Sequence, residues 1–132
     1  MGHIFALSGC SGSGKTTFLN EIFKNNPMQL RLLVRSTSRP IRKNEYEGVD
    51  YEYLSINGFM QKLFANDYVH VEQIGDSFFG IDAHLIEETI SSDDDGIIMA
   101  GRGAIHLKTI YGSNATVLFL HSGTRRSLLN PS

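Results

Sequence analysis

The stretch GCSGSGKTT, residues 9–17, decides the fold. It fits the pattern G-x-x-x-x-G-K-[S/T], in which a glycine-rich backbone curls so that successive N–H groups face a phosphate. The apolar run HIFALS precedes it at 3–8, and TTFLNEIF follows at 16–23 with apolar residues at helical spacing. Strand, loop and helix in this order are what the motif requires, because the N-terminus of the helix adds free N–H donors. A glycine-serine linker that matches by chance would not lie between two apolar elements.

We therefore predict an ATP site over this loop. Lys15 is expected to neutralise charge on the outer phosphates during catalysis, and the Thr16 hydroxyl is expected to ligate Mg²⁺. The predicted ATP-binding residues are Gly9, Cys10, Ser11, Gly12, Ser13, Gly14, Lys15, Thr16 and Thr17.

Length and composition indicate one compact domain of 132 residues. The formal net charge of −2 gives no global field that would draw the chain to nucleic acid or to a membrane surface. The single cysteine cannot form an internal disulfide, which suits a reducing cytoplasm. No membrane span or signal peptide is evident from the pattern. We expect a cytoplasmic protein without nucleic-acid or membrane partners, and its oligomeric state is left open.

The remaining apolar runs alternate between strand and helix patterns. Strands are predicted at 30–36, 68–74, 96–101 and 115–122, and helices at 57–67, 81–91 and 103–112. The apolar face of the first of these helices is expected to consist of Phe59, Met60, Leu63 and Phe64. The alternation predicts an α/β fold with a parallel sheet covered by helices on both faces. Ligands would bind beyond the carboxyl ends of the strands, where 9–16, 36–42 and 100–103 would converge.

A polar, basic and aromatic segment, TSRPIRKNEYEGVDYEYLS at 37–55, interrupts this alternation. Arg39 and Arg42 lie three residues apart around Pro40, and two neighbouring guanidiniums form a fork-like receptor for a phosphate. Tyr51 adds a hydroxyl to the same group. A solvated loop whose charges pair locally is the alternative. Beside a phosphate loop, a second anion site is the better interpretation.

Three segments carry a family resemblance: GCSGSGKTTFL, STSRPIRKNEYEGVDYEYLS at 36–55, and FFGI at 78–81. They resemble the phosphate loop, the monophosphate-binding segment and the Tyr-Tyr-Gly element of guanylate kinases, and the resemblance covers about residues 3–122. It implies a P-loop nucleoside monophosphate kinase that transfers a phosphoryl group from ATP, with Mg²⁺, to GMP or dGMP. It also implies a single domain with a core at 1–35 and 82–132 and a monophosphate-binding insertion at 36–81.

The resemblance also implies site residues. Arg39 and Arg42 would join Lys15 in catalysis, Glu45 would brace the arginine pair, and Glu72 would accept hydrogen bonds from guanine. The full set implied for the monophosphate is Arg35, Ser36, Arg39, Arg42, Glu45, Tyr51, Glu72, Phe79 and Gly80.

Several positions depart from the family's pattern. Guanylate kinases usually have a serine at the position of Arg35 and a serine or threonine at that of Ile81, and both hydroxyls reach the base. Phe78 and Phe79 replace the tyrosine pair. The strand GIIMAGRG at 96–103 lacks the family's acidic residues, and the aspartates just before it are interpreted as a solvated turn.

Two alternatives therefore stay open at this point. Arg35 and the missing acids also resemble ribose bisphosphate phosphokinases, and a non-catalytic guanylate-kinase-like binding module is the third possibility. The family continues with an arginine-bearing lid after residue 122, so we expect this chain to transfer phosphate slowly, with Arg125 and Arg126 in a solvated terminus. The five histidines, His3, His70, His84, His106 and His121, are expected to be ordinary surface or partly packed residues.

Overall fold

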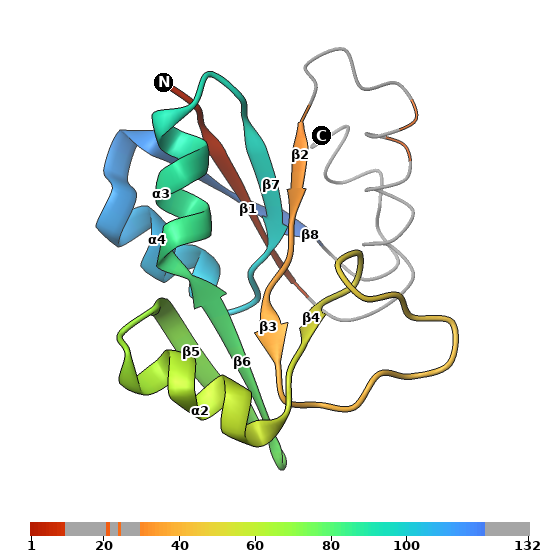
Figure 1. Ribbon diagram of the computed structural model, residues 1–132. Coiled ribbons are helices and arrows are strands. Elements are labelled where there is room, and N and C mark those ends of the chain that lie inside the picture. Colours follow the sequence, from red (N-terminus) through yellow and green to blue (C-terminus); the bar gives the residue numbers. More distant parts are fainter. Residues whose placement is uncertain (10–20, 22–23, 25–29, 121–132) are drawn as a thin grey trace.

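The computed structural model describes residues 1–9, 21, 24 and 30–120 (Figure 1). The predicted ATP-binding residues 10–17, the helix after them, and Arg125 and Arg126 lie outside the described residues. The described elements are, in chain order, β1 (Ile4–Gly9), β2 (Arg31–Leu33), β3 (Ser36–Thr37), β4 (Glu52–Tyr53), α2 (Ile56–Phe64), β5 (Tyr68–Ile74), β6 (Ser77–Asp82), α3 (Ala83–Ser91), β7 (Gly96–Met99), α4 (Gly103–Tyr111), the 3₁₀ turn η1 (Gly112–Asn114) and β8 (Ala115–Leu120).

Four of these strands form a parallel sheet in the order β2-β7-β1-β8, which confirms the predicted α/β architecture. Both faces of this sheet are buried along β1. Alternate residues of a strand point to opposite sides, so each side contributes to a different buried cluster. On β1, Ile4 and Ala6 pack into one buried cluster, whereas Leu7 packs into a second cluster on the other side. Strands of this kind read as nearly continuous apolar runs, and so their positions were predictable.

Helices α3 and α4 cover one face of the parallel sheet (Figure 1). Ile86 and Ile90 of α3 and Leu107 of α4 pack with Ile4 of β1 in the same buried cluster. The Asp82 carboxylate caps α3 by accepting a hydrogen bond of 2.8 Å from the backbone N–H of His84. No helix in the described ranges is long and apolar enough to cross a membrane.

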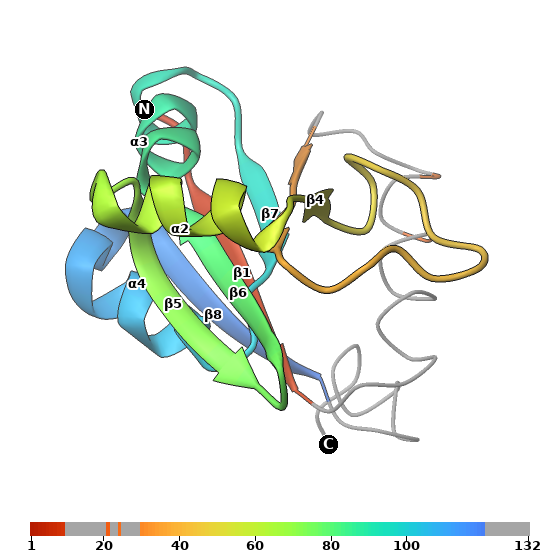
Figure 2. The same ribbon diagram turned by 60° about the horizontal axis from the view of Figure 1, so that its bottom comes forward.

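A second sheet lies below the parallel one in Figure 1, in the order β4-β3-β6-β5. Strands β3 and β4 are parallel, whereas β6 runs antiparallel to both β3 and β5. Helix α2 lies across one face of this sheet (Figure 2), where Phe59 stacks on Tyr68 at a centroid distance of 4.7 Å and contacts Phe78 at 5.8 Å. The opposite face is left for the residues of the candidate site.

The structure corrects three of the sequence predictions. The single strand expected at 30–36 is two strands, β2 and β3, which belong to different sheets because the chain crosses between them at Val34 and Arg35. Strand β6 was not predicted, and the helix expected from residue 81 begins at Ala83, because the preceding residues are the end of β6. Phe64, expected on the apolar face of α2, is 79% exposed because the helix ends there and only Phe59 is fully buried.

Candidate functional site

The candidate site lies on the face of the second sheet away from α2. The register across this sheet places Tyr53 beside Thr37, Thr37 beside Phe79, and Phe79 beside Glu72. Residues directly opposite one another on adjacent strands present their side chains to the same face. We call this surface the arginine face, and define it by Arg35, Arg39, Tyr51, Tyr53, Phe79 and Glu72.

Arg39 of this face forms a close ion pair with Glu45. The Arg39 guanidinium donates to both oxygens of Glu45, from Nη1 to Oε1 at 3.1 Å and from Nη2 to Oε2 at 2.9 Å. Two parallel bonds of this kind fix the plane of the guanidinium as well as its position. The hydrogen bonds from Arg39 lower the pKa of Glu45 to about 2, so this carboxylate is ionised at neutral pH.

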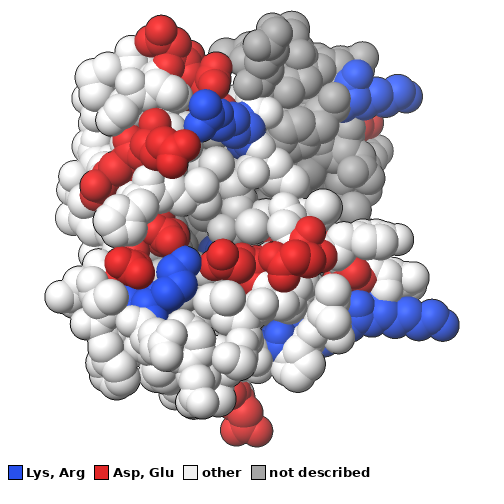
Figure 3. Space-filling view, in the orientation of Figure 1, with Lys and Arg blue, Asp and Glu red and all other residues white. Residues whose placement is uncertain are grey.

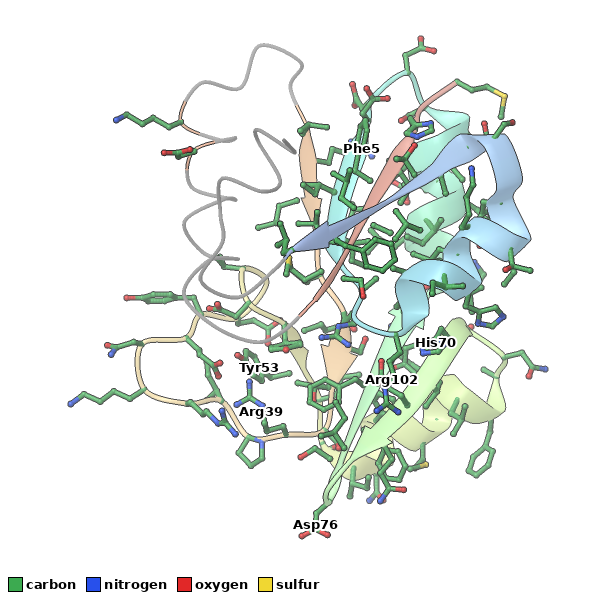
Figure 4. The ribbon with its side chains drawn as sticks, turned by 180° about the vertical axis from the view of Figure 1, so that it is seen from behind. Phe5, Arg39, Tyr53, His70, Asp76 and Arg102 are labelled. Carbon is green, nitrogen blue, oxygen red and sulfur yellow. The ribbon has the colours of Figure 1, made fainter. Side chains whose placement is uncertain are left out.

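Two further donors complete the environment of Glu45. Its Oε1 accepts a hydrogen bond of 2.9 Å from the backbone N–H of Arg42 and one of 2.8 Å from the Tyr53 hydroxyl. Arg39 and Tyr53 lie next to each other beside β3 and β4 in Figure 4. Burial, and then the hydrogen bond to Glu45, raises the pKa of Tyr53 to about 12, so its hydroxyl keeps its proton and remains a donor.

Two aromatic rings hold the second arginine of the face. The Cζ atom of Arg35 lies 5.2 Å from the centre of the Phe79 ring and 5.6 Å from that of Tyr51. Arg39 lies over the same Tyr51 ring at 5.2 Å. Such contacts suit a guanidinium, which is planar and weakly hydrated. Phe79 therefore contributes a ring face to this site and no hydroxyl.

Arg35 also reaches across the sheet to Glu72. Its Nη1 lies 3.6 Å from Oε1 of Glu72, and the two side chains are only 11% and 14% exposed. The Nε of Arg35 and the Oε1 of Glu72 are buried and have no hydrogen-bond partner in the part of the chain that is described. Gly101, which follows β7 with φ +56°, lies against both, because a Cβ there would be 3.4 Å from Arg35 Nη1 and 3.6 Å from Glu72 Oε1. A buried donor and a buried acceptor without partners are costly, and a ligand that hydrogen-bonds to them would lower this cost.

The structure does not bring all predicted residues to this face. The Ser36 hydroxyl donates to Glu52 at 2.5 Å, and Gly80, which pairs with Ser36, packs against the ring of Tyr68. Both belong to the face that α2 covers, because strand residues alternate. Ile81, at the position where the family carries a hydroxyl, is fully buried in the core with the α3 and α4 residues. These positions cannot contact a ligand held by Arg39 without a rearrangement.

Arg42 and Gly9 are two further predicted site residues that the structure describes. The Arg42 side chain is exposed and makes no hydrogen bond or ion pair with any described residue, so its guanidinium is available. Gly9 ends β1 beside Leu120 with φ +146°, and a Cβ there would lie 2.1 Å from the Leu120 carbonyl oxygen, so only glycine fits. The other predicted ATP-binding positions cannot be placed, because they lie outside the described residues.

Three residues of this region were missed by the sequence prediction. Tyr53 belongs to the quoted insertion, but no spacing rule distinguishes its hydroxyl from that of Tyr51. His70 and His106 were predicted to be surface or partly packed residues, as they are, but their contacts were not predicted: their Nδ1 atoms lie 3.1 Å apart and His70 Nε2 lies 3.6 Å from Glu72. The contact joins β5 to α4 over a long sequence separation, and a single sequence carries no signal for such a pair.

The described residues hold no group of three or more histidine, cysteine, aspartate or glutamate side chains that could bind a metal ion. Strand β7 ends at Met99 without a carboxylate, so its end offers no acidic ligand for Mg²⁺. Acidic and basic side chains are interspersed on the face of the molecule in Figure 3. The described part of the site therefore offers several guanidinium groups beside the buried Glu72 carboxylate, which suits a phosphate ester with a hydrogen-bonding group attached.

A parallel α/β sheet with an adjoining arginine face of this kind belongs to the class of nucleotide-kinase folds. The family model described as guanylate kinase matches residues 1–128. The chain belongs to the guanylate kinase family.

Individual relatives agree with this assignment. The chain is 32% identical over 122 residues to a guanylate kinase of Salinibacter ruber, a match that covers 89% of this chain and 63% of the relative. It is 28% identical over 120 residues to a guanylate kinase of Hydrogenovibrio crunogenus, covering 90% and 58%. The crystal structure of guanylate kinase from Anaplasma phagocytophilum matches the fold with a TM-score of 0.73 at 20% identity, covering 89% and 59%. The chain thus spans about 60% of the length of the relatives it matches.

Proposed function

We propose that the protein transfers the terminal phosphoryl group of ATP to a phosphate oxygen of GMP or dGMP. The main observation behind this proposal is the Arg39–Glu45 pair. It fixes the orientation of a guanidinium that could bind the phosphate of the acceptor nucleotide, in addition to the phosphates of ATP. Family membership supports the same reaction class. The matches reported above do not favour the two alternative functions, a ribose bisphosphate phosphokinase and a non-catalytic binding module.

Among the described residues, the hydrogen bonds of Arg39 leave one edge of its guanidinium without a partner. A guanidinium has five N–H donors. Nη1 uses its two on Glu45 and on the carbonyl of Pro40, and Nη2 uses one on Glu45. The Nε–H and the second Nη2–H point along the remaining edge, and they match two oxygens of one phosphate. Arg42 and Tyr51 would supply further donors to that phosphate.

Glu72 and Arg35 support a guanine base. Guanine presents N–H donors at N1 and N2 and an acceptor at O6, so it can satisfy the unpaired Glu72 oxygen and an unpaired Arg35 donor together. Adenine has no N–H at N1 and would leave the carboxylate without a donor there. We therefore propose that GMP is preferred to AMP.

Phosphoryl transfer requires positioning and charge neutralisation, with little covalent chemistry from the protein. Arg39 and Arg42 would hold the acceptor phosphate in line, and Lys15 would stabilise charge on the donor phosphates. Thr16 would hold Mg²⁺, which neutralises phosphate charge when it is bound with ATP. The location of these last two residues is not described, so their roles stay predictions. A cytoplasmic location is likewise proposed, from the single cysteine.

A coupled kinase assay over a panel of acceptors tests the proposal. GMP and dGMP should each yield ADP and the corresponding diphosphate in equal amounts, whereas AMP, CMP, UMP and ribose 1,5-bisphosphate should react far more slowly. Arg39→Met should lower the rate by about 10² to 10³, the usual cost of one lost charge-stabilising donor. Arg31→Met is the matched control, because Arg31 lies on β2 in the other sheet, where it pairs with Asp94. Faster turnover of ribose 1,5-bisphosphate than of GMP would overturn the proposal.

A further inference from the structure

A chain of three side chains leads from the arginine face to the surface of α4. His70 Nε2 lies 3.6 Å from Glu72 Oε1, and His70 Nδ1 lies 3.1 Å from His106 Nδ1. We call His106, His70 and Glu72 the histidine row. His70 Nε2 and Glu72 Oε1 are both buried, and neither has a hydrogen-bond partner among the described residues. In Figure 4, His70 lies where β5 approaches α4.

The lack of a side chain at Gly103 allows this contact. A Cβ at Gly103, the first residue of α4, would lie 2.8 Å from His70 Cδ2 and 2.7 Å from Ile81 Cδ1. The helix therefore approaches the imidazole closely only because residue 103 has no side chain. The rings of His70 and His106 meet edge to face, with centroids 5.3 Å apart.

The two contacts of His70 fix which nitrogens carry protons. A hydrogen bond between two Nδ1 atoms needs an N–H on one ring and a lone pair on the other. Because Nε2 of His70 faces a carboxylate oxygen, a lone pair there would be repelled, so Nε2 carries the proton of the neutral ring. His70 then accepts at Nδ1, and His106 donates from its own Nδ1.

We infer that His70 and His106 are positioning residues for Glu72, and that protonation of His70 weakens the binding of the acceptor nucleotide. The inference rests on the proposed function, in which Glu72 accepts hydrogen bonds from the base. With His70 neutral, one N–H orients the carboxylate and leaves it able to accept from the base. With His70 cationic, the ion pair with Glu72 strengthens and competes with the base for the same oxygens.

Burial favours the neutral form of His70 at neutral pH, because it lowers the pKa of this imidazole. The Glu72 carboxylate raises the pKa of His70, whereas His106 and Arg35 lower it. Among the described residues, these three are the titratable and charged groups that act on the His70 ring, from β5, from α4 and from the β2–β3 connection. Acidification below the ordinary histidine range is therefore required to charge His70.

The first experiment reads the protons directly in the protein without nucleotide. Long-range ¹H–¹⁵N correlation spectra of the imidazoles near pH 8 should show His70 protonated at Nε2 and His106 at Nδ1. His70 protonated at Nδ1 would overturn the inference. This measurement does not involve GMP or turnover, so its outcome is independent of whether the proposed function holds.

The second experiment measures GMP affinity by calorimetry at pH 8 and pH 5. The phosphate of GMP itself titrates near pH 6, so the comparison is between variants. His70→Gln keeps an N–H toward Glu72 but does not titrate; its affinity at pH 8 should stay near that of the wild type, and its loss at pH 5 should be smaller. His70→Leu should bind about tenfold more weakly at pH 8, because no N–H dipole then orients the Glu72 carboxylate.

His84→Gln is the matched control, because His84 also faces a carboxylate, that of Asp67 at 3.3 Å, but on the exposed surface of α3. It should keep the pH dependence of the wild type. An equal pH dependence in the wild type and in His70→Gln would contradict the inference. Should His70→Leu fail to fold, His106→Leu tests the same row, since it removes the donor to His70 from an exposed helix position. Wild-type protein that bound no GMP would refute the proposed function, and the tautomers would still decide the positions of the protons.

Discussion

The Arg39 guanidinium and the Glu45 carboxylate face each other through two hydrogen bonds of 2.9 and 3.1 Å. The same carboxylate accepts from the backbone of Arg42 and from the Tyr53 hydroxyl, so four donors meet one acidic group. Three of these donors meet Oε1 and one meets Oε2. Glu45 is therefore an organising centre of the loop, and the free edge of Arg39 is what remains for a ligand.

Glu45→Gln should weaken GMP binding. The amide turns an N–H₂ group toward one of the donors, so at least one hydrogen bond to a charged group is lost, about 1.5 to 3 kcal/mol. Calorimetric titration with GMP measures the change. Glu47→Gln is the control in the same loop, because Glu47 accepts the backbone N–H of Tyr53 and contacts no guanidinium in the part of the chain that is described. Equal GMP affinity in both variants would show that Glu45 does not organise the phosphate site.

The stabilisation by Glu45 should depend on pH. Its pKa in the folded protein is about 2, against an ordinary value of 4.5, so the folded state binds this proton less readily than the unfolded state. The contribution is therefore complete above about pH 4.5 and is lost as the pH falls toward about 2. Urea unfolding of wild type and Glu45→Gln should show a free-energy difference that shrinks over this window. A difference that grows on acidification would contradict the assignment.

Tyr53→Phe should lower the free energy of unfolding by less than Glu45→Gln does at neutral pH. It removes one donor to Glu45 and leaves the ring, so the expected loss in the free energy of unfolding is about 0.5 to 1.5 kcal/mol. Chemical denaturation measures it. Tyr46→Phe is the matched control, since the Tyr46 side chain is exposed and its hydroxyl has no hydrogen bond within the described ranges. Identical stability of the two variants would argue against a positioning role for Tyr53.

Arg35→Ser should reduce the preference for GMP over AMP. Arg35 is the proposed donor to guanine O6, and one good arginine contact to guanine is worth about 1 to 3 kcal/mol of discrimination. The ratio of the two affinities, measured by calorimetry, is the readout. An unchanged ratio would mean that Glu72 alone selects the base.

The parallel core was predictable because its signal is local. Strands β7 and β8 are apolar runs between polar segments, and β5 was predicted with the bounds found in the structure, Tyr68–Ile74. The break between β2 and β3 was not predictable, because nothing in LRLLVRS marks the point where the chain leaves one sheet for another. Strands of two residues, such as β3 and β4, are defined by their pairing with neighbouring strands and leave no pattern of their own in the sequence.

The candidate site was predicted unevenly for a related reason. The spacing of Arg39 and Arg42 indicated a phosphate receptor, and the resemblance pointed to Glu45, which the structure places on Arg39. Which face of a short strand a residue occupies depends on its pairing, so the orientation of Ser36 toward Glu52 could not be read from the sequence. The contact of His70 with His106 depends on the close approach of α4 at Gly103, which is a property of the fold.

The central claim is that the free edge of Arg39 binds the phosphate of the acceptor nucleotide. The most direct test is calorimetric titration of Arg39→Met and wild-type protein with GMP and, separately, with Mg·ATP. We predict that the variant loses GMP binding and keeps the wild-type affinity for Mg·ATP, since Arg39 belongs to the acceptor site alone. Equal GMP affinity in the two proteins would contradict the account and place the acceptor elsewhere.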